Sequence, residues 1–225
     1  MKVLLLVIIT ILFFFVPTLV RKWRNIPVLI AVTVAAAVNT NYYLSFDYPV
    51  EMGIFILGMD ALVGFIYIYS LIIVAFESSS KHAYELAISS VAAIVLAGII
   101  ETCAKTAANG GLTYETGYPF LFNLVSAVAC LIGGFLAIYL ADKIRNTGFN
   151  VYLAIAFSCL VGGIVHYILF SLGLMISKPD ILQEAAKYNS CVYGGLLETV
   201  ILIPLGLLNY FFSKKVLKIK NPTEQ

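Results

Sequence analysis

The sequence predicts an all-α polytopic integral membrane protein with seven transmembrane helices. The chain has 225 residues, of which 61% are hydrophobic and only 12% are charged, and its mean hydropathy is +0.98. These values lie far from those of water-soluble domains. Runs of about 20 apolar residues, the length that crosses a bilayer, recur along the whole chain. The stretches between them are too short for a soluble catalytic domain, and the net charge of +2 does not indicate nucleic-acid binding.

The predicted spans are apolar runs bounded by charged, proline or polar residues. In chain order they cover residues 3–20, 26–44, 53–76, 84–105, 119–141, 150–174 and 190–212. The first run is interpreted as a stop-transfer helix and not as a secretory signal, because Pro17 and the basic cluster at 21–24 follow it without a small-residue cleavage pattern. The second run is the least regular, since its fully apolar part ends at Val38 and the helix has to continue through polar residues.

Basic residues orient the predicted bundle, because Lys and Arg in short loops are retained on the cytoplasmic side. If the spans alternate in direction, most of the basic residues fall on one side: Arg21, Lys22, Arg24, Lys81, Lys143, Arg145, Lys214, Lys215, Lys218 and Lys220. This bias predicts an outer N-terminus and an inner C-terminus, and only an odd number of spans agrees with it. The plasma membrane is the expected location of the protein.

A single membrane domain, 1–225, is expected, divided by its charged loops. The predicted parts are an extra N-terminal helix with a basic loop (1–25), a first three-helix half (26–105), an outer loop (106–118), a second three-helix half (119–213) and a basic cytoplasmic tail (214–225).

Two pairs of similar segments are compatible with an inverted repeat of the two halves. Gly98 to Thr102 reads G-I-I-E-T where Gly195 to Thr199 reads G-L-L-E-T. Leu62 to Ile66 resembles Leu160 to Ile164 at nearly the same offset. Copies separated by three spans cross the membrane in opposite senses, as in inverted-repeat transporters. Apolar sequences also match by chance, so both interpretations stay open.

Small residues recur every four positions in the fifth predicted span, at Ala129, Gly133, Ala137 and Ala141. This spacing is typical of membrane helices that pack closely. The cysteines form no C-x-x-C pair and are interpreted as small packing residues, with a bridge between Cys103 and Cys191 as the alternative: they are Cys103, Cys130, Cys159 and Cys191.

Ionisable residues within the spans are candidates for function, because an unpaired charge in the hydrocarbon layer costs several kcal/mol. Asp60, Glu101, His166 and Glu198 come from four different predicted helices and fall in the outer half of the membrane. This placement predicts a polar cavity open to the outside. Three further polar residues lie at compatible depth: Lys105, Asn39 and Asn123. Three carboxylates favour a cation, an amine or a heterocycle that presents N–H donors.

Ordinary structural roles are the alternative for these residues. Glu101 and Lys105 have the i, i+4 spacing of a helix-surface ion pair, and His166 could simply hydrogen-bond a neighbouring helix. The cavity hypothesis tolerates the loss of one of these residues, but it depends on Asp60 and Glu198.

Enzyme motifs are missing from the sequence. His82 and His166 lie at opposite ends of their predicted spans, so a zinc site is not expected. The chain has no G-x-S-x-G and no phosphate-binding G-x-x-x-x-G-K-[ST] motif, and no cofactor is expected. An intramembrane hydrolase that pairs His166 with Ser158 or Ser171 is kept as an alternative.

Several stretches resemble the vitamin uptake transporter family of queuosine-precursor carriers. They are the Ala-rich span with Ala31 and Ala35, F-I-L-G-M-D-A-L-V-G-F from Phe55 to Phe65, and the segment from Leu140 through A-D-K-I-R to S-C-L-V-G-G-I-V-H-Y-I-L-F. The stretches are also similar to S subunits of energy-coupling-factor transporters. The resemblance implies a carrier in which Asp60, with Gly64 nearby, serves the solute. His166 stands where that family pattern has an acidic residue.

The sequence therefore predicts a membrane transporter that takes up a small polar solute, such as a vitamin, a nucleobase-like compound or an amine. Asp60 and Glu198 would accept hydrogen bonds from the solute, while His166 and Glu101 would orient it or carry a coupled proton. One alternative is a substrate-binding subunit that works with a separate ATP-hydrolysing complex. The intramembrane hydrolase is the other.

Overall fold

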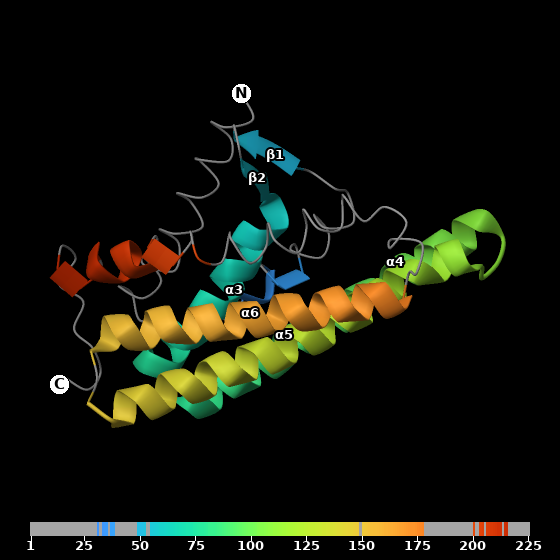
Figure 1. The fold of residues 1–225 in the computed structure, drawn as a ribbon. Helices are drawn as coiled ribbons and strands as arrows, with labels where there is room; N and C mark the ends of the chain where they lie inside the picture. Colours follow the sequence, from blue (N-terminus) through green and yellow to red (C-terminus); the bar gives the residue numbers. More distant parts are fainter. Residues whose placement is uncertain are drawn as a thin grey trace.

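The structure is a computed structural model, and it describes residues 49–52, 55–148 and 150–177, together with most of 31–38 and of 200–215. Its elements are two short strands followed by four helices (Figure 1): β1 Pro49–Met52, β2 Phe55–Gly58, α3 Met59–Glu77, α4 Ser80–Asn109, α5 Tyr114–Asn146 and α6 Val151–Ser177. The described parts of 31–38 and 200–215 are helical as well. Apart from the small hairpin, the described chain is helical, as the sequence predicts.

Three of the helices are long and apolar enough to cross a membrane: Ser80–Asn109, Gly117–Asn146 and Val151–Gly173. The first two contain the predicted spans 84–105 and 119–141, and the third matches the predicted span 150–174 to within one residue at each end. A 30-residue helix is about 45 Å long, which exceeds the roughly 30 Å of a bilayer's hydrocarbon core. In Figure 1, α5 and α6 run side by side, and the hairpin of α4 and α5 extends past the end of α6.

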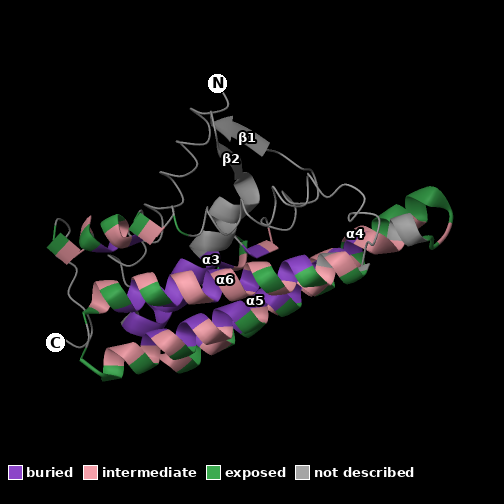
Figure 2. Cartoon of the chain, viewed as in Figure 1, coloured by how far each residue is buried: buried purple, intermediate pink, exposed green. Residues whose placement is uncertain are grey.

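The outer faces of these helices carry large apolar side chains. Figure 2 shows exposed residues along the outside of α4, α5 and α6 and buried residues where the helices face one another. The exposed apolar side chains in the span region include Ile88, Leu96, Ile99, Ile100, Leu124, Val128, Ile132, Leu153, Phe157, Ile168 and Leu172. An exposed apolar surface on three neighbouring helices is what lipid contact requires. We call this surface the apolar belt.

The part of helix α3 from Tyr67 to Phe76 is enclosed by the rest of the bundle. Every residue from Tyr67 to Phe76 is buried, and Leu71 and Ile72 are fully inaccessible. Such a helix is apolar on all sides because it has no face toward solvent. At its C-terminal end, Arg145 of α5 donates to the Ala75 carbonyl at 3.3 Å. This hydrogen bond ties the last turn of α3 to the end of α5.

The third predicted span, 53–76, is corrected at its beginning. Residues 55–58 form strand β2, which pairs antiparallel with β1 in the register Pro49↔Gly58 and Met52↔Phe55. The helix begins only at Met59. The apolar run Phe55-Ile56-Leu57 fits a strand as well as a helix, and periodicity does not separate the two in so short a run. The 19 residues of α3 still reach about 28 Å.

Helix α4 has a defined cap at each end. Ser79 is extended, with φ −164° and ψ 156°, and its hydroxyl accepts from the His82 amide. At the other end Gly110 has φ 74°, a left-handed conformation that glycine adopts without strain, and its N–H donates to the Thr106 carbonyl. These caps explain why α4 continues past its apolar run into the polar segment before Gly110.

The remaining predicted spans lie largely outside the described residues. This applies to 3–20 as a whole, to most of 26–44 and to the first half of 190–212. The described helical part of the last one is anchored to the bundle, since Tyr69 of α3 donates to Asn209 Oδ1 at 2.7 Å. Tyr152 of α6 meets Tyr210 edge to face, with ring centroids 5.2 Å apart.

Candidate functional site

The contact between α5 and α6 is built on small residues. A Cβ atom placed on Gly133 would lie 2.7 Å from the carbonyl oxygen of Gly162, and one on Gly162 would lie 2.7 Å from the Ala137 Cβ. Contacts this short mean that only a glycine fits at either position. The predicted close packing through Ala129, Gly133, Ala137 and Ala141 is therefore confirmed where α5 faces α6.

His166 lies in this contact. Its side chain is 9% exposed, and a Cβ on Gly133 would lie 2.8 Å from the His166 Cβ. The imidazole stacks on Phe170 with an interplanar angle of 4° and a centroid distance of 6.2 Å. The Ala129 carbonyl approaches the ring. Nδ1 is buried, and among the described residues it has no hydrogen-bond partner. A polar atom in an apolar interior without a partner is unusual and points to function.

The depth of His166 follows from the helix register. Gly98 of α4 packs on Asn123 of α5, whereas His166 packs on Gly133. The ten residues between Asn123 and Gly133 correspond to about 15 Å along α5. Glu101 lies beyond Gly98, farther still from His166. The structure thus places His166 near the middle of the apolar belt and Glu101 at its edge, so these two residues do not share one depth.

Glu101 and Lys105 form an ion pair on α4. Lys105 Nζ lies 2.8 Å from Glu101 Oε1, and the side chains are 49% and 36% exposed, respectively. Next to them, the Phe120 amide of α5 donates to Thr102 Oγ1 at 3.0 Å. This bond joins the two helices at the turn that contains Pro119. The pair has the geometry of the helix-surface alternative.

Asn123 is buried between α4 and α5. Its Nδ2 donates to the Pro119 carbonyl at 2.8 Å, one turn earlier in the same helix. A proline in a helix lacks an N–H group and weakens the preceding turn, and the Asn123 side chain adds a hydrogen bond at this place. A Cβ on Gly98 would lie 2.7 Å from the Asn123 Cβ. Asn123 therefore fills the space that Gly98 leaves.

Three predicted site residues cannot be placed in full. Asp60 belongs to the first turn of α3, but its side chain lies outside the described part of the structure. Asn39 and Glu198 also lie outside the described residues. Their convergence with His166 stays a prediction.

Two buried hydroxyl groups near the centre of the bundle were not predicted. Tyr67 of α3 is 2% exposed and Ser90 of α4 is 0% exposed, and neither Tyr67 Oη nor Ser90 Oγ has a hydrogen-bond partner among the described residues. A tyrosine or serine inside an apolar run carries no sequence signal that separates it from a packing residue. The three-dimensional environment is what singles them out.

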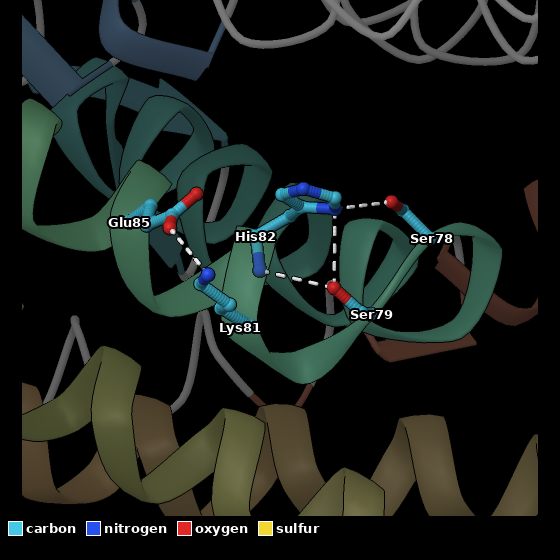
Figure 3. A network of polar contacts seen from close by, with 5 residues as sticks. All are labelled: Ser78, Ser79, Lys81, His82 and Glu85. Carbon is cyan, nitrogen blue, oxygen red and sulfur yellow. Dashed lines mark hydrogen bonds and ion pairs between the residues drawn. The ribbon is translucent and has the colours of Figure 1, made fainter.

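Of the two serines considered as partners of His166, Ser158 does not bond to it. Ser158 Oγ and His166 Nδ1 each lack a hydrogen-bond partner among the described residues, so they do not bond to each other. A serine–histidine contact occurs instead at the exposed start of α4, where Ser78 Oγ and Ser79 Oγ lie 2.6 and 3.1 Å from His82 Nδ1. Figure 3 shows this network beside the ion pair of Lys81 and Glu85. The arrangement caps the helix, since Ser79 also receives the His82 amide.

The cysteines of the described chain are free thiols. Cys130 and Cys159 are buried, and Cys103 is exposed in the last third of α4, before the turn to α5. Cys191, the other half of the alternative bridge from Cys103, lies outside the described residues.

Comparison of the chain with models of known protein families, with curated proteins and with solved structures gives no match. The site has to be interpreted from its own geometry.

Proposed function

We propose that the protein is a seven-span transporter for uptake of a small polar solute, with its N-terminus outside and its C-terminus inside the plasma membrane. Support for a membrane location comes from the three apolar helices and from the apolar belt around them. The seven-span count and the orientation rest on the apolar runs and on the distribution of Lys and Arg in the sequence.

The observation that carries the transport proposal is the buried imidazole of His166, with its unpaired Nδ1, in the middle of the belt. A buried polar group without a partner destabilises a folded protein by roughly 1–3 kcal/mol. The Ala129 backbone of α5 satisfies part of the ring, whereas Nδ1 has no partner among the described residues. In a membrane protein such a group marks a solute or proton pathway.

Uptake by purified protein in liposomes tests the proposal. Vesicles that contain the chain alone are expected to accumulate a labelled solute from a panel of vitamins, nucleobases and amines, whereas protein-free vesicles do not. His166→Gln is expected to reduce the initial rate at least about tenfold, since it removes a group that can both donate and accept a proton. The matched control is His82→Gln, which changes an exposed histidine at the start of α4 and leaves the rate unchanged.

Two results would contradict the proposal. Saturable binding of a solute without any accumulation would indicate a binding subunit that needs an ATP-hydrolysing partner. Full uptake by the His166→Gln variant would remove the site on which the proposal depends.

A further inference from the structure

Two consecutive glycines of α5 contact polar residues of two different helices. Gly133 faces α6, where a Cβ atom would lie 2.8 Å from the His166 Cβ. Gly134 faces α3, where a Cβ atom would lie 3.2 Å from Tyr67 Oη and 2.9 Å from Leu71 Cδ1. The His166 Cβ and the Tyr67 hydroxyl thus approach adjoining residues at the middle of the apolar belt, and the imidazole of His166 lies beside Ala129, one turn earlier in α5.

A third polar group lies at the same level on α4. Gly98 is opposite Asn123 in the antiparallel pair of α4 and α5. Eight residues back along α4 is Ser90, and eight residues forward along α5 is Leu131, close to the two glycines. Tyr67, Ser90 and His166 are all buried, and Tyr67 Oη, Ser90 Oγ and His166 Nδ1 lack hydrogen-bond partners among the described residues. Other buried hydroxyl groups without a partner among the described residues, at Ser70, Thr106 and Ser158, lie elsewhere along the helices, and each such group carries a penalty.

The described residues around this level carry no formal charge other than the one His166 could acquire. Asp, Glu, Lys and Arg are absent from Tyr67–Phe76 of α3, 86–100 of α4, 116–141 of α5 and the whole of α6. Among the side chains of these described segments a charged solute would meet no opposite charge to replace its hydration, which is strongly unfavourable in a medium of low dielectric constant. A neutral solute that forms hydrogen bonds does not meet this barrier.

We infer that Tyr67, Ser90 and His166 bind an uncharged solute that carries both hydrogen-bond donors and acceptors, such as an amide or a lactam ring. The hydroxyl groups and the imidazole can each donate or accept a hydrogen bond, so together they can pair with both the N–H and the C=O of an amide or lactam. This inference rests on the proposed transport function and narrows the solute class that the carboxylates had suggested, because it excludes amines in their cationic form.

In the structure, neighbouring atoms fill the space beside Gly133 and Gly134. At Gly133 the neighbouring atom is a backbone oxygen of α6, which cannot move without shifting the helix, whereas at Gly134 the neighbours are side-chain ends of α3. Rotation of Tyr67 and Leu71, or a small shift of α3, opens space beside Gly134 while α5 and α6 stay together. The solute therefore enters between α3 and α5.

Matched solutes that differ only in charge test the inference. Nicotinamide, nicotinate and 3-(aminomethyl)pyridine share one ring and are neutral, anionic and cationic at pH 7. Uracil, orotate and 5-(aminomethyl)uracil form a second set. The thermal unfolding midpoint of the purified protein is measured against the concentration of each, since a ligand that binds only the folded state raises the midpoint. A neutral member of at least one set is expected to raise it, and its charged partners are not.

Tyr67→Phe is the decisive variant, and Tyr69→Phe is its matched control on the same helix. Tyr67→Phe is expected to weaken binding of the neutral solute about tenfold and to leave the midpoint of the ligand-free protein unchanged or higher, because it removes an unpaired hydroxyl. Tyr69→Phe breaks the hydrogen bond to Asn209 Oδ1. It is therefore expected to lower the ligand-free midpoint while the ligand-induced shift remains.

Several outcomes overturn the inference. In the solute sets, the inference is wrong if a charged member raises the midpoint or if every neutral member leaves it unchanged. In Tyr67→Phe, it is wrong if the affinity for the neutral solute is unchanged. It is also wrong if the ligand-free midpoint of Tyr67→Phe is lower, because ordered water would then already satisfy the hydroxyl. Uptake of a charged solute by the liposomes refutes the inference alone and leaves the transport function standing. Absence of any uptake refutes the transport function.

Discussion

The two interfaces of α5 are built in different ways. Toward α6, backbone meets backbone, since the Gly162 carbonyl lies where a side chain on Gly133 would begin. Toward α4, side chains fill the contact: Asn123 covers Gly98, and Tyr84 meets Phe135 edge to face at 4.9 Å. Backbone contacts fix two helices relative to each other, whereas side chains can change rotamer. We therefore expect α5 and α6 to behave as one rigid pair against which α3 and α4 can move.

The largest expected effect is that of Gly133→Ala. The new Cβ would lie 2.7 Å from the Gly162 oxygen, so α5 and α6 have to separate, at a cost of about 2–3 kcal/mol. Thermal or denaturant unfolding in detergent micelles measures the loss. Gly111→Ala is the control, because a Cβ there meets nothing within 4 Å. Equal stability of the two variants would show that the α5–α6 contact is not rigid.

Gly98→Ala is expected to have a somewhat smaller effect, about 1–2 kcal/mol, because the atom it strikes is the Asn123 Cβ and not a backbone oxygen. The double variant Gly98→Ala with Asn123→Gly should lose less stability than the sum of the two single changes, since removal of the Asn123 Cβ makes room for the new methyl group. Unfolding of the four proteins gives the coupling energy. Strict additivity would mean that α4 and α5 are also fixed by their backbones.

Glu101→Gln is expected to change the unfolding free energy by no more than about 0.5 kcal/mol. The ion pair with Lys105 joins residues of one helix, and both side chains are partly exposed, a situation in which such pairs contribute little. Unfolding at low and at high salt measures the difference. A loss well above 1 kcal/mol would show that Glu101 has a second partner and would strengthen its assignment to the solute site.

The sequence predicts the parts of the fold that depend on continuous patterns. The spans that became α4, α5 and α6 were predictable because long apolar runs have one solution in a bilayer. The close α5–α6 contact followed from small residues spaced by four. Both are properties of single helices or of one helix face, so they are visible in one dimension.

The errors come from properties of the assembled bundle. The run from Phe55 is short and apolar, and only tertiary context decides that it forms a strand before α3 begins at Met59. The relative depth of Glu101 and His166 depends on how α4 and α6 are aligned against α5, and counting residues from the end of each apolar run does not give that alignment. Tyr67 was missed because a buried hydroxyl without a partner looks the same in sequence as one that has a partner.

The reach of the α4–α5 hairpin beyond α6 provides a reporter of orientation. Cys103 is an exposed thiol on this hairpin, while Cys130 and Cys159 are shielded within the bundle. In the Cys191→Ser variant, Cys103 is the thiol to be labelled by a maleimide that cannot cross the membrane. If the hairpin faces the medium, the reagent should label Cys103 in intact cells. If the hairpin faces the cytoplasm, it should label Cys103 only after the cells are opened. A natural side chain can thus reveal which way the whole protein is inserted.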